Sequence, residues 1–128
     1  MKVTTKQRCD WDVLVRKLTL QQKREFAAFA AKQVSHISSA PADGITGVYA
    51  ASAAFDAADA AAAALVADHE VADYSAADYS YELDTSVAFF TAAAIESAII
   101  AAYAAADFSD AAASEMKNAI LNYGISLI

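Results

Sequence analysis

Alanine dominates this chain, and the residues that break helices are nearly missing from it. Of the 128 residues 35 are Ala, whereas Gly occurs 3 times and Pro once. Alanine is the best helix former because it loses no side-chain entropy in a helix, and glycine and proline are the poorest. The composition therefore predicts an all-α protein and argues against collagen-like and turn-rich β architectures.

Apolar residue types make up 58 % of the chain, which suffices for one hydrophobic core and one domain over residues 1–128. Each alanine contributes little burial energy, so the bulkier apolar side chains are expected to supply most of it. The single cysteine, Cys9, excludes an internal disulfide and is typical of a reducing compartment. No apolar segment follows the polar N-terminus, so we expect no signal peptide and a cytoplasmic protein.

Helical periodicity and capping residues predict five or six helices joined by short connections, hence a compact antiparallel bundle with close Ala-rich packing. Thr19 and Gln22 have the spacing of a capping box, and Ser109 or Asp110 is expected to cap the last helix, which Gly124 would end. The predicted helices cover residues 10–17, 20–37, about 44–68 (through Val48, Phe55 and Val66), one or two shorter helices in 69–84, then 85–106 and 110–123.

Charge is distributed very unevenly. Residues 1–32 hold eight Lys or Arg and three acids, whereas residues 33–116 hold thirteen acids and no Lys or Arg. This divides the chain into a basic N-terminal helical segment (1–37), a loop (38–44) and an acidic Ala-rich body (45–128). The acidic surface can serve solubility, or it can bind a basic partner through complementary charge. Free nucleic acid is not an expected partner, because carboxylates repel phosphates.

The span 68–84 is the first candidate for partner binding, because it repeats Asp-Tyr-Ser at 73–75 and 78–80 among further acids. Tyrosine supplies rigid contact area, and neighbouring carboxylates can pair with arginine, which also stacks on aromatic rings. The alternative is that some rings face the core and the acids are merely solvated. The predicted partner-binding residues are Asp68, Glu70, Asp73, Tyr74, Asp78, Tyr79, Tyr81, Glu82 and Asp84.

No pattern in the sequence predicts catalysis, a metal site or a cofactor. Glu96, in an otherwise apolar segment, is expected to be buried, and a structural hydrogen bond is a more frequent role for it than catalysis. His36 and His69 lack metal-site spacing, and the GxSxG, P-loop and GxGxxG motifs are all missing. A reactive cysteine needs surroundings that lower the pKa of its thiol. Apart from Arg8, Cys9 has no neighbour in the sequence that would do so, and no reactive thiol is expected. We expect a protein that is not an enzyme.

One segment, residues 87–106, is long and apolar enough to span a membrane. Glu96 lies in its middle, where a charge is costly in lipid, and alanine is only weakly hydrophobic. A buried central helix is the preferred interpretation, so no membrane partner is expected.

The sequence also resembles a known group. A tryptophan-bearing segment, residues 9–15 (CDWDVLV), precedes a helix with small residues at 26–31 (FAAFAA), and long Ala runs broken by Asp and Tyr follow. This layout is similar to the alanine-rich helical immunity proteins of bacterial toxin–immunity loci and phage genomes. The resemblance implies a small cytoplasmic protein that neutralises a partner by binding it. The chain departs from the family pattern in residues 33–116, which lack the arginines scattered among the family's Ala repeats.

Charge and resemblance together predict a non-enzymatic inhibitor that neutralises a basic, nucleic-acid-acting partner, such as a toxin, through an acidic helical surface. An alternative with the same physics is a phage-encoded anti-defence inhibitor that mimics nucleic acid and blocks a CRISPR or restriction complex. A second alternative is a self-associating structural or phage assembly protein. The sequence leaves the oligomeric state open.

Overall fold

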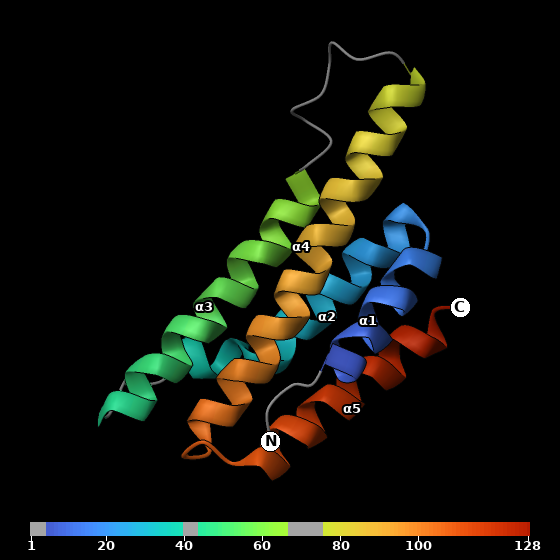
Figure 1. Cartoon of the computed structure of the whole chain (residues 1–128). Helices are drawn as coiled ribbons and strands as arrows, with labels where there is room; N and C mark the ends of the chain where they lie inside the picture. Colours follow the sequence, from blue (N-terminus) through green and yellow to red (C-terminus); the bar gives the residue numbers. More distant parts are fainter. Residues whose placement is uncertain (1–4, 40–43, 67–75) are drawn as a thin grey trace.

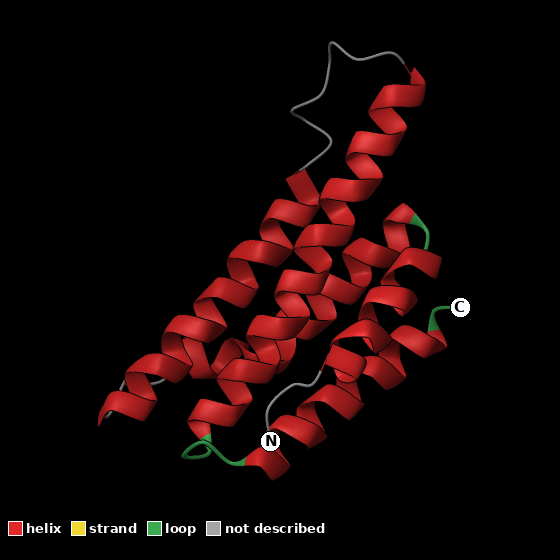
Figure 2. Ribbon diagram, in the orientation of Figure 1, coloured by secondary structure: helices red, strands yellow, loops and turns green. Residues whose placement is uncertain are grey.

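The structure is a computed structural model that describes residues 5–39, 44–66 and 76–128, with side chains described for residues 11–37, 44–66 and 85–128. The described residues form helices and loops without any strand (Figure 2), which confirms the all-α prediction. Their five helices are α1 (Thr5–Lys17), α2 (Leu20–Ser39), α3 (Gly44–Val66), α4 (Ala76–Ala105) and α5 (Asp110–Ser126).

Helix α4 is the centre of the arrangement, since it contacts each of the other four helices. Helices α3 and α4 lie side by side and run in opposite directions, α2 packs against both, and α1 lies beside α5 (Figure 1). The segment Thr85–Ala105 of α4 is, among the described residues, the one helix long and apolar enough to cross a membrane. A buried core helix passes the same test, and half of the most apolar window of this segment is buried in the bundle.

The main core joins bulky side chains from α1, α2, α4 and α5. The predicted apolar stripe of α1, which includes Trp11, Leu14 and Val15, is buried there, as the periodicity required. The ring of Phe29 on α2 stacks on Tyr123 of α5 with the centroids 4.0 Å apart. The other large side chains of this core are Phe26, Val34, Ile95, Ile99 and Ile120.

Two helix starts follow the predicted capping. The backbone N–H of Gln22 donates to Thr19 Oγ1 (3.2 Å), and the N–H of Thr19 donates to Gln22 Oε1 (2.9 Å), which completes the capping box of α2. Ser109 Oγ accepts from the N–H of Ala112 at the start of α5. Local side-chain to backbone bonds of this kind depend on a few adjacent residues, which is why the sequence predicts them.

Three boundaries differ from the prediction. Helix α1 starts at Thr5 rather than at Asp10, and α4 starts at Ala76, so residues 76–84 continue the central helix instead of forming a separate one. Gly124 lies inside α5 and is buried, although it was expected to end that helix. A Cβ atom there would lie 2.5 Å from Phe26 Cζ and 2.8 Å from Leu14 Cδ2. The glycine is therefore required for the close approach of α5 to α1 and α2, not for helix termination.

Candidate interaction surface

Helix α3 is turned so that its small residues face the bundle and its large apolar residues face outward. Every buried residue of α3 is an alanine: Ala50, Ala53, Ala54, Ala57, Ala61 and Ala64. The exposed residues include all of its bulky apolar side chains: Ile45 (86 % exposed), Val48 (58 %), Tyr49 (52 %), Phe55 (61 %), Leu65 (55 %) and Val66 (51 %). The expectation that bulky residues supply the burial energy is thus wrong for α3. Alanines on its inner face let its backbone approach α4 closely, and the inner face has no room for larger groups.

A run of exposed apolar side chains on one helix is unusual for a protein surface. Isolated exposed hydrophobic residues are common, but contiguous patches mark sites of interaction. Burying one such side chain contributes roughly 1.5–3 kcal/mol. The outer face of α3 therefore leaves favourable free energy unused in the isolated chain, and a binding partner could recover it.

The turn between α4 and α5 adds an aromatic ring to this face. Asp107 and Phe108 both adopt left-handed backbone conformations, with φ of 55° and 61°. This conformation costs about 1–2 kcal/mol per residue, and a bulky residue such as Phe rarely adopts it. The turn places the Phe108 ring edge-on to the ring of Tyr49, with the two centroids 6.3 Å apart. The centroid of the Tyr103 ring lies 5.3 Å from that of Phe108. Thr46 Oγ1 donates to Asp107 Oδ1 (3.4 Å), which holds the turn against the start of α3.

We call these residues the acidic–aromatic surface: Ile45, Val48, Tyr49, Ser52, Asp56, Asp107 and Phe108. Two adjacent hollows shape it. The larger, about 590 Å³, is lined by Gly44, Ile45, Val48, Tyr49 and Ser52. The smaller, about 150 Å³, lies between α3 and α4 and is lined by Tyr49, Ser52, Ala53, Asp56, Ser97 and Ile100. Because Tyr49 and Ser52 line both hollows, the apolar hollow is continuous with one that holds a carboxylate.

Most of the described carboxylates of the acidic body are exposed, whereas its one lysine is buried. Five of its acids are exposed: Asp56, Asp59, Asp107, Asp110 and Glu115. Residues 33–116 contain no Lys or Arg, and Lys117 is buried with its Nζ 5.9 Å from the centroid of the Trp11 ring. In the described chain after Lys32, therefore, no Lys or Arg side chain is exposed. The exposed charged side chains described on α3 and in the turn after α4, those of Asp56, Asp59 and Asp107, are all negative.

Two basic residues of α2 are directed into the bundle rather than to solvent. Lys23 is 2 % exposed, and Arg24 Nε donates to the carbonyl of Ala64 (3.0 Å) in the last turn of α3. Helix α3 has no basic residue in its own last turn, so Arg24 supplies the cation that stabilises that end of the helix dipole. Arg16, Lys17 and Lys32 of the same basic segment are exposed.

The predicted Asp68–Asp84 site lies largely beyond what the structure describes. Asp68, Glu70, Asp73 and Tyr74 fall outside the described residues. Asp78, Tyr79, Tyr81, Glu82 and Asp84 lie on the first turns of α4, but their side chains are not among those described. The partner-binding role of this span stays a prediction.

The expectation for Glu96 is wrong in one respect, since this carboxylate is partly rather than fully buried. It lies in a strip of partly exposed α4 residues at helical spacing, with Ala93, Ser97 and Ile100, so one edge of the central helix remains open to water. His36 is exposed on α2, and His69 is outside the described residues. Within the described chain, no group of three or more His, Cys, Asp or Glu side chains could hold a metal ion.

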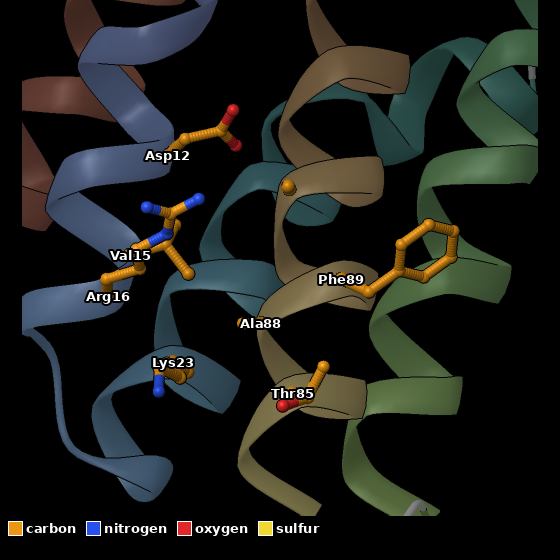
Figure 3. A pocket seen from close by; sticks show the side chains of 8 residues that line it. Asp12, Val15, Arg16, Lys23, Thr85, Ala88 and Phe89 are labelled. Atoms are coloured by element: carbon orange, nitrogen blue, oxygen red, sulfur yellow. The ribbon is translucent and has the colours of Figure 1, made fainter. Parts of the chain in front are cut away.

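A separate pocket of about 420 Å³ lies between α1, α2 and α4 (Figure 3). Asp12 and Arg16 extend into it from α1, Lys23 faces it from α2, and Thr85 and Phe89 line it from α4. It combines two cations and one carboxylate with an apolar floor. Its described lining has one hydroxyl, that of Thr85, and no histidine.

Comparisons of the chain with protein-family models, curated proteins and solved structures find no match. The resemblance to immunity proteins therefore stays a prediction. Sequence reasoning missed the acidic–aromatic surface because its parts, residues 45–56 and 107–108, are far apart in the chain. The exposed position of the bulky α3 residues had one weak local signal, the polar residues Ser52, Asp56 and Asp59 on the same face, which the bulky apolar side chains around them obscured.

Proposed function

We propose that this protein is a non-enzymatic binding protein that neutralises a basic protein partner through the acidic–aromatic surface of its helical body, together with the nearby carboxylate of Asp59 on the same helix. The observation that supports the proposal is the composition of the outer face of α3. Large apolar side chains and the carboxylates of Asp56 and Asp59 are exposed together there, and no exposed lysine or arginine of the body competes with a cationic partner.

The two kinds of side chain have different tasks in such a complex. Apolar and aromatic groups supply the buried area that holds a complex together. The carboxylates attract a basic partner, raise the association rate and disfavour acidic partners, including nucleic acids. Arginine suits this surface best, because one guanidinium can stack on a tyrosine or phenylalanine ring and pair with a carboxylate.

A nucleic-acid-acting enzyme is the kind of partner that we propose. Its phosphate-binding channel is lined by lysine and arginine, and an acidic helical domain can occupy that channel in place of phosphates. An immunity protein against a nuclease toxin and a phage-encoded inhibitor of a bacterial defence complex share this mechanism. Gene neighbourhood separates them, because a toxin gene next to this one favours immunity and a phage early region favours the anti-defence role.

Self-association is a second candidate function, favoured by the exposure of Ile45, Val48 and Phe55 on a single helix. Two copies could cover these side chains by packing against each other. Light scattering at micromolar concentration tests this directly, and a monomer under those conditions contradicts it.

Charge reversal tests the proposed function. The tagged protein captures partners from bacterial lysate at low salt, and the bound nucleic-acid enzyme is then purified and titrated with three forms of the chain. We expect the wild type and Glu25→Lys, which alters an exposed acid on α2, to bind and inhibit that enzyme. The double variant Asp56→Lys/Asp59→Lys should lose both properties. Binding by wild type should also weaken steeply toward physiological ionic strength, where the Debye length is about 8 Å.

Two outcomes contradict the proposed function. One is equal inhibition by wild type and the Asp56→Lys/Asp59→Lys variant, since recognition would then not depend on these carboxylates. The other is an affinity that does not change with salt, since the charge asymmetry would then play no part in recognition. Circular dichroism of each variant checks that the helices are intact.

A further inference from the structure

We infer that the two hollows of the acidic–aromatic surface bind one basic amphipathic helix of the partner, with an apolar side chain in the larger hollow and an arginine or lysine in the smaller. This inference rests on the proposed function and specifies how the partner is recognised. The partner helix would carry its apolar and its cationic side chain about two turns apart.

The larger hollow suits an apolar anchor. Its described lining consists of Gly44, Ile45, Val48, Tyr49 and Ser52; the three bulky residues are each more than half exposed, and none of the five is charged. An isoleucine or leucine of the partner would cover these side chains and be covered by them. Apolar anchors in pockets of this kind account for most of the affinity at protein interfaces.

The smaller hollow suits a cation. The Asp56 carboxylate accepts charge-assisted hydrogen bonds, and the hydroxyls of Ser52 and Ser97 can accept further bonds from a guanidinium or ammonium. Tyr49 also lines this hollow, so a cation paired with Asp56 would lie near an aromatic side chain that can attract it. Within residues 33–116 there is no lysine or arginine to occupy this place.

The spacing of the hollows fits a helical occupant. Val48, which lines only the larger hollow, lies eight residues before Asp56, which lines only the smaller, and at 1.5 Å per residue this is about 12 Å along α3. A partner helix lying along α3 has the same rise, so side chains seven residues apart reach both hollows. The backbone groups of a helix are already hydrogen-bonded within it, so α3 cannot pair with an extended strand of the partner. Recognition would therefore use side chains, as in other helix-in-groove complexes.

Matched peptides test the inference with the full-length protein. The probe is a fluorescent Ala/Gln-based helical peptide with a leucine and, seven residues later, an arginine. The control peptides replace the leucine by alanine or the arginine by glutamine. Fluorescence anisotropy at low salt measures each affinity for wild type, Ile45→Ser, Asp56→Asn and Asp59→Asn. Asp59 is the matched control, because it is an exposed carboxylate on the same helix that lines neither hollow.

We expect Asp56→Asn and Ile45→Ser each to weaken binding of the Leu/Arg peptide about tenfold, and Asp59→Asn to change it less than twofold. The Asp56→Asn effect should vanish with the peptide that lacks arginine, and the Ile45→Ser effect with the peptide that lacks leucine. Coupling of Asp56 with the peptide arginine, and of Ile45 with the peptide leucine, would show that the arginine occupies the smaller hollow and the leucine the larger.

Other results overturn the inference. Equal effects of Asp56→Asn and Asp59→Asn would mean that the surface attracts cations without a specific site. If the whole partner still depends on Asp56 and Asp59 in the charge-reversal experiment, the proposed function then survives and only the two-hollow arrangement fails. Failure of the peptide to bind, or a dimer in light scattering that Ile45→Ser abolishes, would also reject a partner helix as the occupant.

Discussion

Helices α2 and α3 pack against each other but divide their residues between inside and outside in opposite ways. On α2, Phe26 and Val34 are fully buried, while Lys32 and Ser35 face solvent. On α3 the buried residues are alanines, and the bulky apolar side chains are exposed. An ordinary amphipathic helix places its large apolar residues inward because burial stabilises the fold. The comparison indicates that the large side chains of α2 stabilise the fold, whereas those of α3 contribute little to it, which supports the proposal that the outer face of α3 contacts another molecule.

The largest expected effect compares one phenylalanine from each helix. Phe26→Ala on α2 should lower the free energy of unfolding by about 3–5 kcal/mol, because it leaves a cavity in the main core. Phe55→Ala on α3 should change it by no more than about 0.5 kcal/mol, because that ring is 61 % exposed. Urea denaturation measures both. Similar losses for the two variants would mean that the outer face of α3 contributes to stability after all.

The next prediction concerns how closely α5 approaches α2. Gly124→Ala should cost about 1–3 kcal/mol, since the added Cβ would overlap Phe26 and Leu14. Helix propensity alone would make alanine more stabilising than glycine by about 1 kcal/mol. A decrease in the free energy of unfolding would therefore come from the overlap and not from helix propensity. Asn118→Ala, at an exposed position of the same helix, serves as the control and should be neutral or slightly stabilising. A stabilised Gly124→Ala variant would contradict the tight packing of α2 against α5.

A smaller effect is expected at the contact between the two compared helices. Arg24→Gln removes the donor to the Ala64 carbonyl and the cation at the C-terminal end of α3, and should cost about 1–2 kcal/mol. Arg24→Lys keeps the charge without the fixed guanidinium geometry and should recover part of the loss. Thermal unfolding followed by circular dichroism compares the two. Equal stability of Arg24→Gln and wild type would show that α2 does not support α3 through this residue.

The sequence predicted those parts of the fold that local patterns determine. The alanine content predicted the all-α fold, the Thr19–Gln22 capping box the start of α2, and the apolar stripe around Trp11 part of the core, but the starts of α1 and α4 were wrong. It could not predict the role of Gly124, which depends on the distant Phe26. The orientation of α3 was also hard to predict, because bulky apolar residues share its outer face with Asp56 and Asp59 while its inner face holds only alanines.

The smallest expected effect on stability tests that orientation most directly. Ile45→Thr and Val48→Thr each keep a β-branched side chain at an exposed α3 position, so each should change the free energy of unfolding by no more than about 0.5 kcal/mol. The same substitution at a buried α2 position, Val34→Thr, places a hydroxyl in the core and should cost about 1–3 kcal/mol. Urea denaturation of the three variants measures this contrast. A clear loss of stability in Ile45→Thr or Val48→Thr would mean that these side chains are buried in solution, which would remove the basis for assigning the outer face of α3 to a partner.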